Sequence, residues 1–206
     1  MAKTVVSFYF GLGSRYSYLA ATQLDRIEAG TDAEFEWLPL QSSELIRRAN
    51  DGRSPFDGNY QSGQYDWAYR QRDAKAWAAH YGVPYKEPVS FRVDPSDLAK
   101  ACWIADHKGR RQAMSWRILR AIFVEGLTMS RDVLGRLASD IGLDGAELVD
   151  ALDEPDVAIR HEAALVQALE DGAFGVPTFV VGSEMLWGND RLPLLEDTLN
   201  RLRDAM

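Results

Sequence analysis

A proline directly before a β-branched run is the feature that most constrains the fold of this chain. Residues 174–181 read Phe-Gly-Val-Pro-Thr-Phe-Val-Val. Proline cannot donate a ladder hydrogen bond, so Pro177 belongs to a turn that leads into a strand. The bond before it is a candidate cis peptide. A cis proline there would expose the backbone N–H and C=O of Val176, which predicts an edge that pairs with an extended peptide ligand.

A second motif follows this strand. Gly188-Asn189-Asp190 precedes a run of leucines at helical spacing, so we interpret it as the start of the last helix, a position that favours anions. Together with the proline turn it describes a site for a small peptide. Simple capping of the last helix is the alternative role of Asn189 and Asp190.

The order of predicted elements indicates an α/β fold. A strand at 5–10, a helix from Tyr16 closed by Gly30, and a strand at 35–38 ended by Pro39 open the chain. Two short strands joined by Gly182-Ser183, a hairpin signal, and a last helix close it. This is the thioredoxin-like arrangement, β-α-β … β-β-α, although pattern alone leaves it one option among several. The predicted division is a thioredoxin-like domain at residues 1–40 and 171–206, split by an all-helical insertion at 41–170.

The insertion is predicted from helix signals. Residues 41–93 are polar, with one helix over about 65–81, and Asp94 with Pro95 then forms a helix start. Ser130 is a predicted cap, and Asp144 with Glu147 forms a possible capping box. A further helix is expected from about 156 to 171.

Composition excludes several classes of function. A net charge of −8 and a pI near 4.9 argue against nucleic acid or an anionic membrane as partner, and no apolar run reaches membrane-spanning length. The chain enters a strand-like segment without a signal-peptide pattern, so we expect a cytoplasmic protein. One cysteine, Cys102, excludes an internal disulfide, and its apolar helical face predicts burial. The three histidines are scattered, so no metal site is predicted.

The two ends of the chain carry a family resemblance. Residues 8–20, Phe-Tyr-Phe-Gly-Leu-Gly-Ser-Arg-Tyr-Ser-Tyr-Leu-Ala, resemble the opening of the DsbA-like branch that contains kappa-class glutathione transferases and 2-hydroxychromene-2-carboxylate isomerases. The closing segments, 174–178 and 187–192, are similar to the isomerases in particular. The resemblance covers nearly the whole chain. It implies a thioredoxin fold with a helical insertion, glutathione as cofactor, a small aromatic or unsaturated substrate, and a homodimer.

The resemblance also implies roles for single residues. DsbA-type proteins begin the first helix with C-x-x-C, and the corresponding residues here are Ser14 and Ser17. A hydroxyl cannot shuttle electrons, so the implied role of Ser14 is a hydrogen bond to the glutathione sulfur, holding it as thiolate. Val176 and Pro177 would hold the cysteinyl part of the tripeptide. The resemblance implies that Asn189 and Asp190 bind the γ-glutamyl end of the tripeptide. Asn50 corresponds to an asparagine that contacts the ligand in the family, in a loop that aligns loosely.

The sequence departs from the family pattern at two positions. Arg15 replaces the usual proline, which places a cation beside the proposed thiolate, where it would stabilise an anion or contact an acidic substrate. Asp66 stands where some members have a lysine near the glutathione carboxylate, which leaves Arg53, Arg70 and Arg72 as candidates to bind that group. Two plainer readings also stand: Ser14 as a helix cap only, and the tryptophans at 67, 77, 103 and 116 as mostly core, with some lining a cleft.

Three functions remain open at this point. The leading hypothesis is a glutathione-dependent cis-trans isomerase of 2-hydroxychromene-2-carboxylate, in which the thiolate adds reversibly, the ring opens, a bond rotates and the thiol leaves unchanged. A kappa-like glutathione transferase would instead keep the sulfur bonded to an electrophile. A non-catalytic thioredoxin-fold module that binds peptide thiols is the third. Disulfide exchange is contradicted by the absence of cysteine at 14 and 17.

Overall fold

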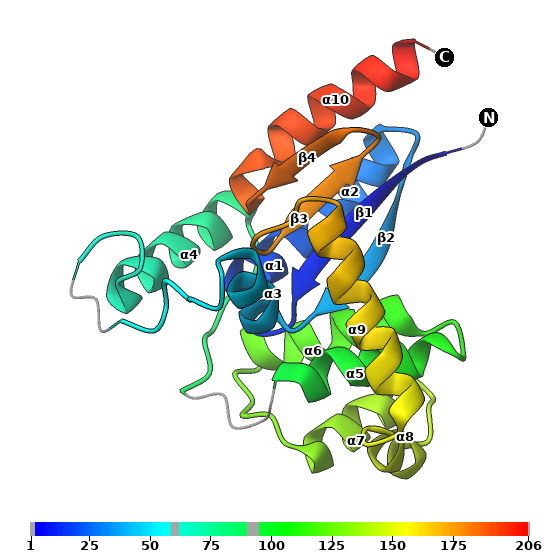
Figure 1. Ribbon diagram of the computed structural model, residues 1–206. Helices are drawn as coiled ribbons and strands as arrows, with labels where there is room; N and C mark the ends of the chain where they lie inside the picture. The colour runs from blue at the N-terminus through cyan, green and yellow to red at the C-terminus, as the bar shows by residue number, and fades with distance from the viewer. Residues whose placement is uncertain (1–2, 59–61, 90–94, 206) are drawn as a thin grey trace.

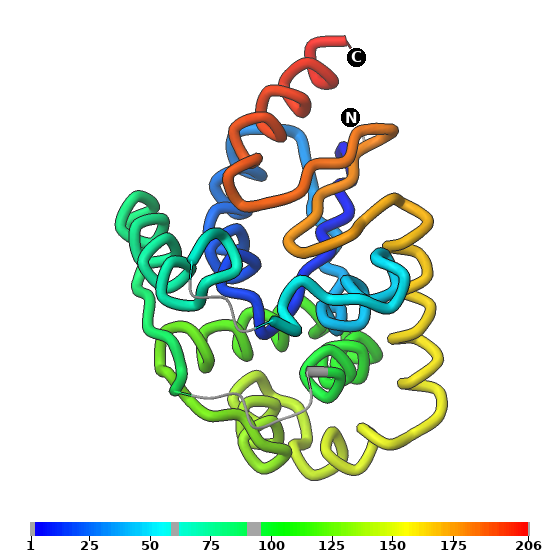
Figure 2. Tube along the Cα trace, turned by 60° about the vertical axis from the view of Figure 1, so that its left-hand side comes forward, coloured from blue at the N-terminus to red at the C-terminus, as the bar shows by residue number. Residues whose placement is uncertain are grey.

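The computed structural model describes residues 3–58, 62–89 and 95–205. The amino and carboxyl ends lie together at one end of the molecule, and the helices α5 to α8 form the other end (Figure 1, Figure 2). The predicted cap Asp94 lies outside the described residues. Within the described residues, no helix combines the length and apolar character needed to cross a membrane.

A mixed sheet forms the centre of the fold. Its strands are β1 (Thr4–Gly11), β2 (Ala33–Leu40), β3 (Thr178–Val181) and β4 (Glu184–Trp187), in the order β2-β1-β3-β4. β1 is parallel to β2 and antiparallel to β3, and β3 and β4 form the predicted hairpin. The predicted thioredoxin-like arrangement of strands is therefore confirmed. β1 lies inside the sheet because its residues are apolar on both faces.

Alternate residues of β1 separate two apolar clusters. Phe8 and Phe10 pack into the larger cluster with α1 (Arg15–Ala21) and α10 (Leu192–Asp204). Tyr9 faces the smaller cluster, which includes residues of α3 and α9. This two-residue alternation is the pleat of a strand, and it explains how one short segment anchors helices on both sides of the sheet.

The remaining helices lie in the sequence between β2 and β3, apart from α2 (Leu24–Gly30), which follows α1. α9 contacts both β2 and α5, so it joins the sheet to the helical end of the molecule (Figure 1). Their bounds are α3 Ser42–Ala49, α4 Trp67–Tyr81, α5 Pro95–Asp106, α6 Arg111–Phe123, α7 Arg131–Asp140, α8 Gly145–Ala151 and α9 Pro155–Glu170.

Predicted caps and buried groups are largely confirmed. Ser130 Oγ accepts from the N–H of Val133, and Asp144 Oδ1 accepts from the N–H groups of Ala146 and Glu147. Cys102 is fully buried on α5. Side-chain acceptors at these positions satisfy N–H groups that the first turn of a helix leaves without partners.

Three local predictions are wrong. The first helix is two, α1 and α2, because Thr22 Oγ1 donates to the carbonyl of Leu19 at 2.6 Å and the helix ends there. β2 does not end at Pro39 but continues to Leu40, since β2 is an edge strand and an edge tolerates proline. α3 was not predicted, because Leu45 alone of its residues is buried and gives no apolar period.

Candidate functional site

Three segments meet at the end of the sheet where β1 leads into α1. β1 and β3 pair with Tyr9 opposite Thr178, so the same register carried two residues further brings Gly11 opposite Val176. A Cβ added to Gly11 would lie 3.3 Å from Val176 Cγ2 and 2.9 Å from Ser42 Cβ. The absence of a side chain at Gly11 therefore lets α3 and the turn before β3 approach β1 closely.

Ser14 caps α1 at this end. Its backbone is extended, with φ −94° and ψ 118°, and its Oγ accepts from the N–H of Ser17 at 3.2 Å. The side chain is partly exposed. A hydroxyl that accepts a cap bond still holds its own proton, so Ser14 can donate a second hydrogen bond outward. The plainer reading, a cap, is thus correct and leaves the donor available.

Ser17 has a structural role. It is fully buried, and its Oγ accepts from the N–H of Gly11 at 3.2 Å. This bond closes the turn between β1 and α1 and thereby fixes the backbone that carries Ser14.

The turn before β3 presents open main chain. The Val176–Pro177 peptide bond is cis. Among the described residues, neither the N–H nor the C=O of Val176 takes part in a hydrogen bond, whereas the Pro177 carbonyl accepts from Gly188 at 2.9 Å. Gly175 is buried, and a Cβ added there would lie 2.6 Å from Trp187 Nε1. Phe174 and Trp187, both exposed, lie beside this turn with their ring centroids 4.9 Å apart and their planes tilted by 55°.

The predicted γ-glutamyl contacts lie on η1 (Asn189–Arg191), which packs against α1. Asn189 is buried, and its backbone carbonyl accepts from Tyr81 Oη at 3.1 Å, so α4 holds η1 in place. The Asp190 side chain is exposed, with only a 3.5 Å ion pair to the adjacent Arg191. The structure thus brings Ser14, the Val176–Pro177 turn and η1 into one neighbourhood.

Asn50, the other predicted glutathione contact, makes a local hydrogen bond. It follows α3, and its Nδ2 donates to the carbonyl of Ile46 at 2.8 Å. Its amide therefore caps its own helix.

Arg15 is not the free cation that the sequence suggested. Its Nε pairs with Glu87 Oε1 at 2.8 Å, and the two side chains are 7% and 9% exposed. The Glu87 carboxylate also accepts from Tyr85 Oη and from Gln71 Nε2. No sequence signal pointed to Glu87, because two of its three partners, Arg15 and Gln71, come from other segments of the chain.

α4 covers this pair. Asp66 caps α4 by accepting from the N–H of Tyr69 at 2.8 Å, which gives the acid at this position a local role. Trp67 is not core: it is 54% exposed, and its ring centroid lies 4.3 Å from Arg15 Cζ. Nearby, burial and a hydrogen bond to Asp73 raise the pKa of Tyr16 to about 12, so its phenol stays neutral.

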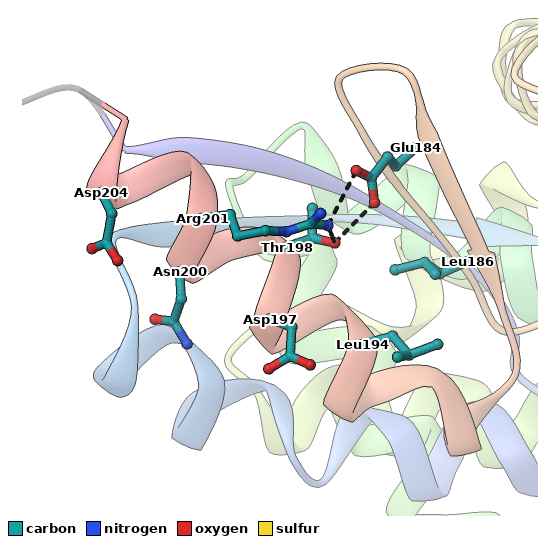
Figure 3. A pocket seen from close by; sticks show the side chains of 8 residues that line it. All are labelled: Glu184, Leu186, Leu194, Asp197, Thr198, Asn200, Arg201 and Asp204. Atoms are coloured by element: carbon teal, nitrogen blue, oxygen red, sulfur yellow. Dashed lines mark hydrogen bonds and ion pairs between the residues drawn. The ribbon is translucent and has the colours of Figure 1, made fainter.

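Two surface pockets lie elsewhere. One, of about 670 Å³, lies between β4 and α10 (Figure 3). In it Glu184 accepts from Thr198 Oγ1 at 2.8 Å and pairs with Arg201. The other, of about 370 Å³, lies between Tyr9 and α9. Neither is lined by Ser14, Val176 or Asp190. These grooves are separate from the candidate site.

The described residues define a class: a thioredoxin fold whose α1 begins at a serine beside a cis-proline turn. Residues 5–200 match the family described as DsbA-like thioredoxin domain. The chain therefore belongs to that family.

Individual members of the family show more specific similarities. The chain is 30% identical to a 2-hydroxychromene-2-carboxylate isomerase of Sphingobium xenophagum over 97% of this chain and 99% of the relative. It superposes on a solved structure of 2-hydroxychromene-2-carboxylate isomerase with a TM-score of 0.84, at 25% identity and with 96% and 95% of the two chains covered. It shares its fold with the cytosolic disulfide reductase DsbM of Pseudomonas aeruginosa with GSH, at a TM-score of 0.65 and 19% identity, over 95% of this chain and 99% of that one.

Proposed function

We propose that this protein is a glutathione-dependent isomerase that acts on 2-hydroxychromene-2-carboxylate or a closely related unsaturated aromatic acid. The proposal rests on one observation: two residues with unused hydrogen-bonding groups lie at the same end of the sheet. Ser14 has a hydroxyl proton that its cap bond does not use, and Val176, beside Gly11 of β1, has main-chain groups without a hydrogen bond among the described residues. The named isomerase relatives span almost the whole chain and support the same activity.

The residues present fit glutathione. The free N–H and C=O of Val176 suit the cysteinyl backbone of the tripeptide, as in β-strand addition. The exposed Asp190 carboxylate suits its amino group, and Ser14 Oγ suits its sulfur. Bound glutathione would supply a thiolate nucleophile that is returned unchanged. Ser14 would stabilise that anion by donating a hydrogen bond to it, and the buried Ser17 would keep Ser14 in position.

Disulfide exchange has no sulfur to use at this site. Serine occupies both positions at the start of α1, and Cys102 is fully buried on α5. Burial raises the pKa of the Cys102 thiol to about 12, so it stays protonated and unreactive at neutral pH.

The test replaces Ser14 and uses a second serine cap as matched control. Ser14→Ala should lower turnover of 2-hydroxychromene-2-carboxylate at least about tenfold at saturating glutathione, because one hydrogen bond to the thiolate is lost. Ser130→Ala removes a cap of the same 3.2 Å geometry from α7 and should leave turnover unchanged. Equal rates in Ser14→Ala and wild type would remove Ser14 from the mechanism.

An isomerase assay, a conjugation assay and a binding measurement separate the competing activities. An isomerase turns over substrate with catalytic glutathione, measured by ultraviolet absorbance. Conjugation of a chloronitroaromatic with stoichiometric loss of thiol would instead indicate a transferase, and glutathione binding without either would indicate a binding module. The homodimer stays a prediction from the family resemblance, for which light scattering is the measurement.

A further inference from the structure

Arg15 carries a buried donor that nothing in the described structure satisfies. The residue is 6% exposed, and its Nε is paired with Glu87. Its Nη1 is buried and has no hydrogen-bond partner. A buried N–H of a charged group without an acceptor is costly, and natural structures rarely leave one unless a ligand or water completes it. This atom belongs to the residue directly after Ser14.

A second guanidinium lies close to the first. Arg70 of α4 is partly buried, and its burial and the like charge of Arg15 lower its pKa. Among the described residues, no carboxylate lies within ion-pair distance of Arg70. Glu87 is shared by three donors, and Asp73 accepts from Tyr16 Oη at 2.7 Å. Arg70 therefore has no carboxylate partner among the described residues, and the carboxylate that pairs with Arg15 is already shared with Gln71 and Tyr85.

Aromatic faces surround both guanidinium groups. Trp67 lies 4.3 Å from Arg15 Cζ, and Phe56 and Tyr16 lie 4.6 Å and 5.7 Å from Arg70 Cζ. Trp67 and Phe56 are 54% and 43% exposed. Exposed ring faces beside cations suit a flat, unsaturated acid, whose π-system can stack while its carboxylate meets the guanidinium.

We propose that Arg15 and Arg70 form a carboxylate-binding subsite where α1 and α4 meet, at the residue that follows Ser14. A carboxylate engages Nη1 of Arg15, which becomes accessible when the exposed Trp67 ring turns away, and Arg70 supplies the second positive charge. The carboxylate comes either from the unsaturated acid substrate or from the glycyl end of glutathione. The subsite rests on the proposed function for its place in the reaction, and binding measured without turnover tests it separately.

The experiment uses two variants and one matched control. Arg15→Gln with Glu87→Gln removes the ion pair without stranding a buried charge, and Arg70→Gln, a partly exposed position, covers the case in which the double variant fails to fold. Arg201→Gln with Glu184→Gln removes an exposed Arg–Glu pair from the groove of Figure 3. Circular dichroism checks folding. The probes, titrated calorimetrically, are cinnamate against cinnamamide without glutathione, and glutathione against its glycine amide.

The outcomes separate the two sources of the carboxylate. A loss of at least tenfold in cinnamate affinity in Arg70→Gln and in the Arg15/Glu87 variant, with cinnamamide weak throughout, supports the subsite and assigns it to the substrate. The same loss for glutathione but not for its amide supports it and assigns it to the glycyl carboxylate. Unchanged affinity for both acids in folded variants overturns it. Because neither readout needs isomerase activity, a carboxylate preference that survives an absence of turnover overturns the proposed function alone.

Discussion

Gly11 illustrates how the site depends on a side chain that is absent. Its Cβ position is closed by Ser42 on one side and Val176 on the other, with the Ser42 contact at 2.9 Å. Real Cβ atoms do not occupy such a space unless backbone moves. Because the obstructing atoms belong to α3 and the proline turn, added volume here should displace the two segments that flank Ser14.

We therefore expect Gly11→Ala to destabilise the protein by about 1–3 kcal/mol and to weaken glutathione binding. Urea unfolding and calorimetry measure the two effects. Gly30→Ala is the matched control, since nothing lies within 4 Å of its Cβ position. It should be neutral or stabilising by about 0.4–1 kcal/mol, as expected when a flexible residue is replaced without strain. Equal stability in the two variants would contradict this account of Gly11.

The residues predictable from sequence are those whose chemistry is local. Ser14 and Pro177 were found because a cap and a turn are written in a few neighbouring residues. Glu87 was not, because its bonds to Arg15 and Gln71 join segments that only the fold brings together. For the same reason, the sequence predicts the charge of Arg15 but not its burial or its ion pair with Glu87.

At the scale of elements, α4 links the two halves of the candidate site. Its first turn carries Trp67 over Arg15, and its last residue, Tyr81, donates to the carbonyl of Asn189 in η1 at 3.1 Å. The Asn189 amide lies 3.4 Å from the same phenol oxygen. η1 is a single short turn, so this anchor from another element decides where Asp190 points.

Tyr81→Phe should therefore weaken glutathione binding several-fold. Without the hydrogen bond from Tyr81, η1 becomes more mobile, and ordering it again costs part of the binding free energy. Isothermal titration measures the change. Tyr9→Phe is the control: it removes a hydrogen bond from Tyr9 Oη to Asp171 at 2.5 Å on the other face of the sheet and should leave glutathione affinity unchanged. A Tyr81→Phe protein that binds as wild type would show that η1 needs no anchor.

The elements missed from sequence share one cause. α3 buries a single apolar residue, Leu45, and on its polar side Arg48 pairs with Glu44 on its own helix and with Glu162 on α9. The break between α1 and α2 depends on the Thr22 hydroxyl, although the apolar spacing continues through it. Apolar periodicity therefore predicts helices that pack by hydrophobic faces and misses features set by polar contacts.

For the molecule as a whole, the order of strands and helices was predictable because each end of the chain encodes half of one sheet. β1 and β2 come from the first part, β3 and β4 from the last, and β1 pairs with both β2 and β3. The helical part between them contacts β2 through α5, α6 and α9. The Arg48–Glu162 pair is one of the contacts that joins α9 to α3, and through α3 to Gly11.

This pair gives the contact between α9 and α3 a predictable pH dependence. The hydrogen bond to Arg48 lowers the pKa of Glu162 below its ordinary value of 4.5. A lowered carboxyl pKa stabilises the folded state at pH above the ordinary value, and the contribution is lost as pH falls through the folded pKa. Glu162→Gln should thus be less stable than wild type at pH 7, by under about 1 kcal/mol because the pair is partly exposed, and the difference should shrink as the pH falls below 4.5. Urea unfolding at pH 7 and at acidic pH measures this difference in stability.

Glu170→Gln, on the same helix and without an ion pair among the described residues, should show no such difference. A Glu162→Gln deficit that persists unchanged in acid would mean that α9 is held to α3 by packing rather than by charge.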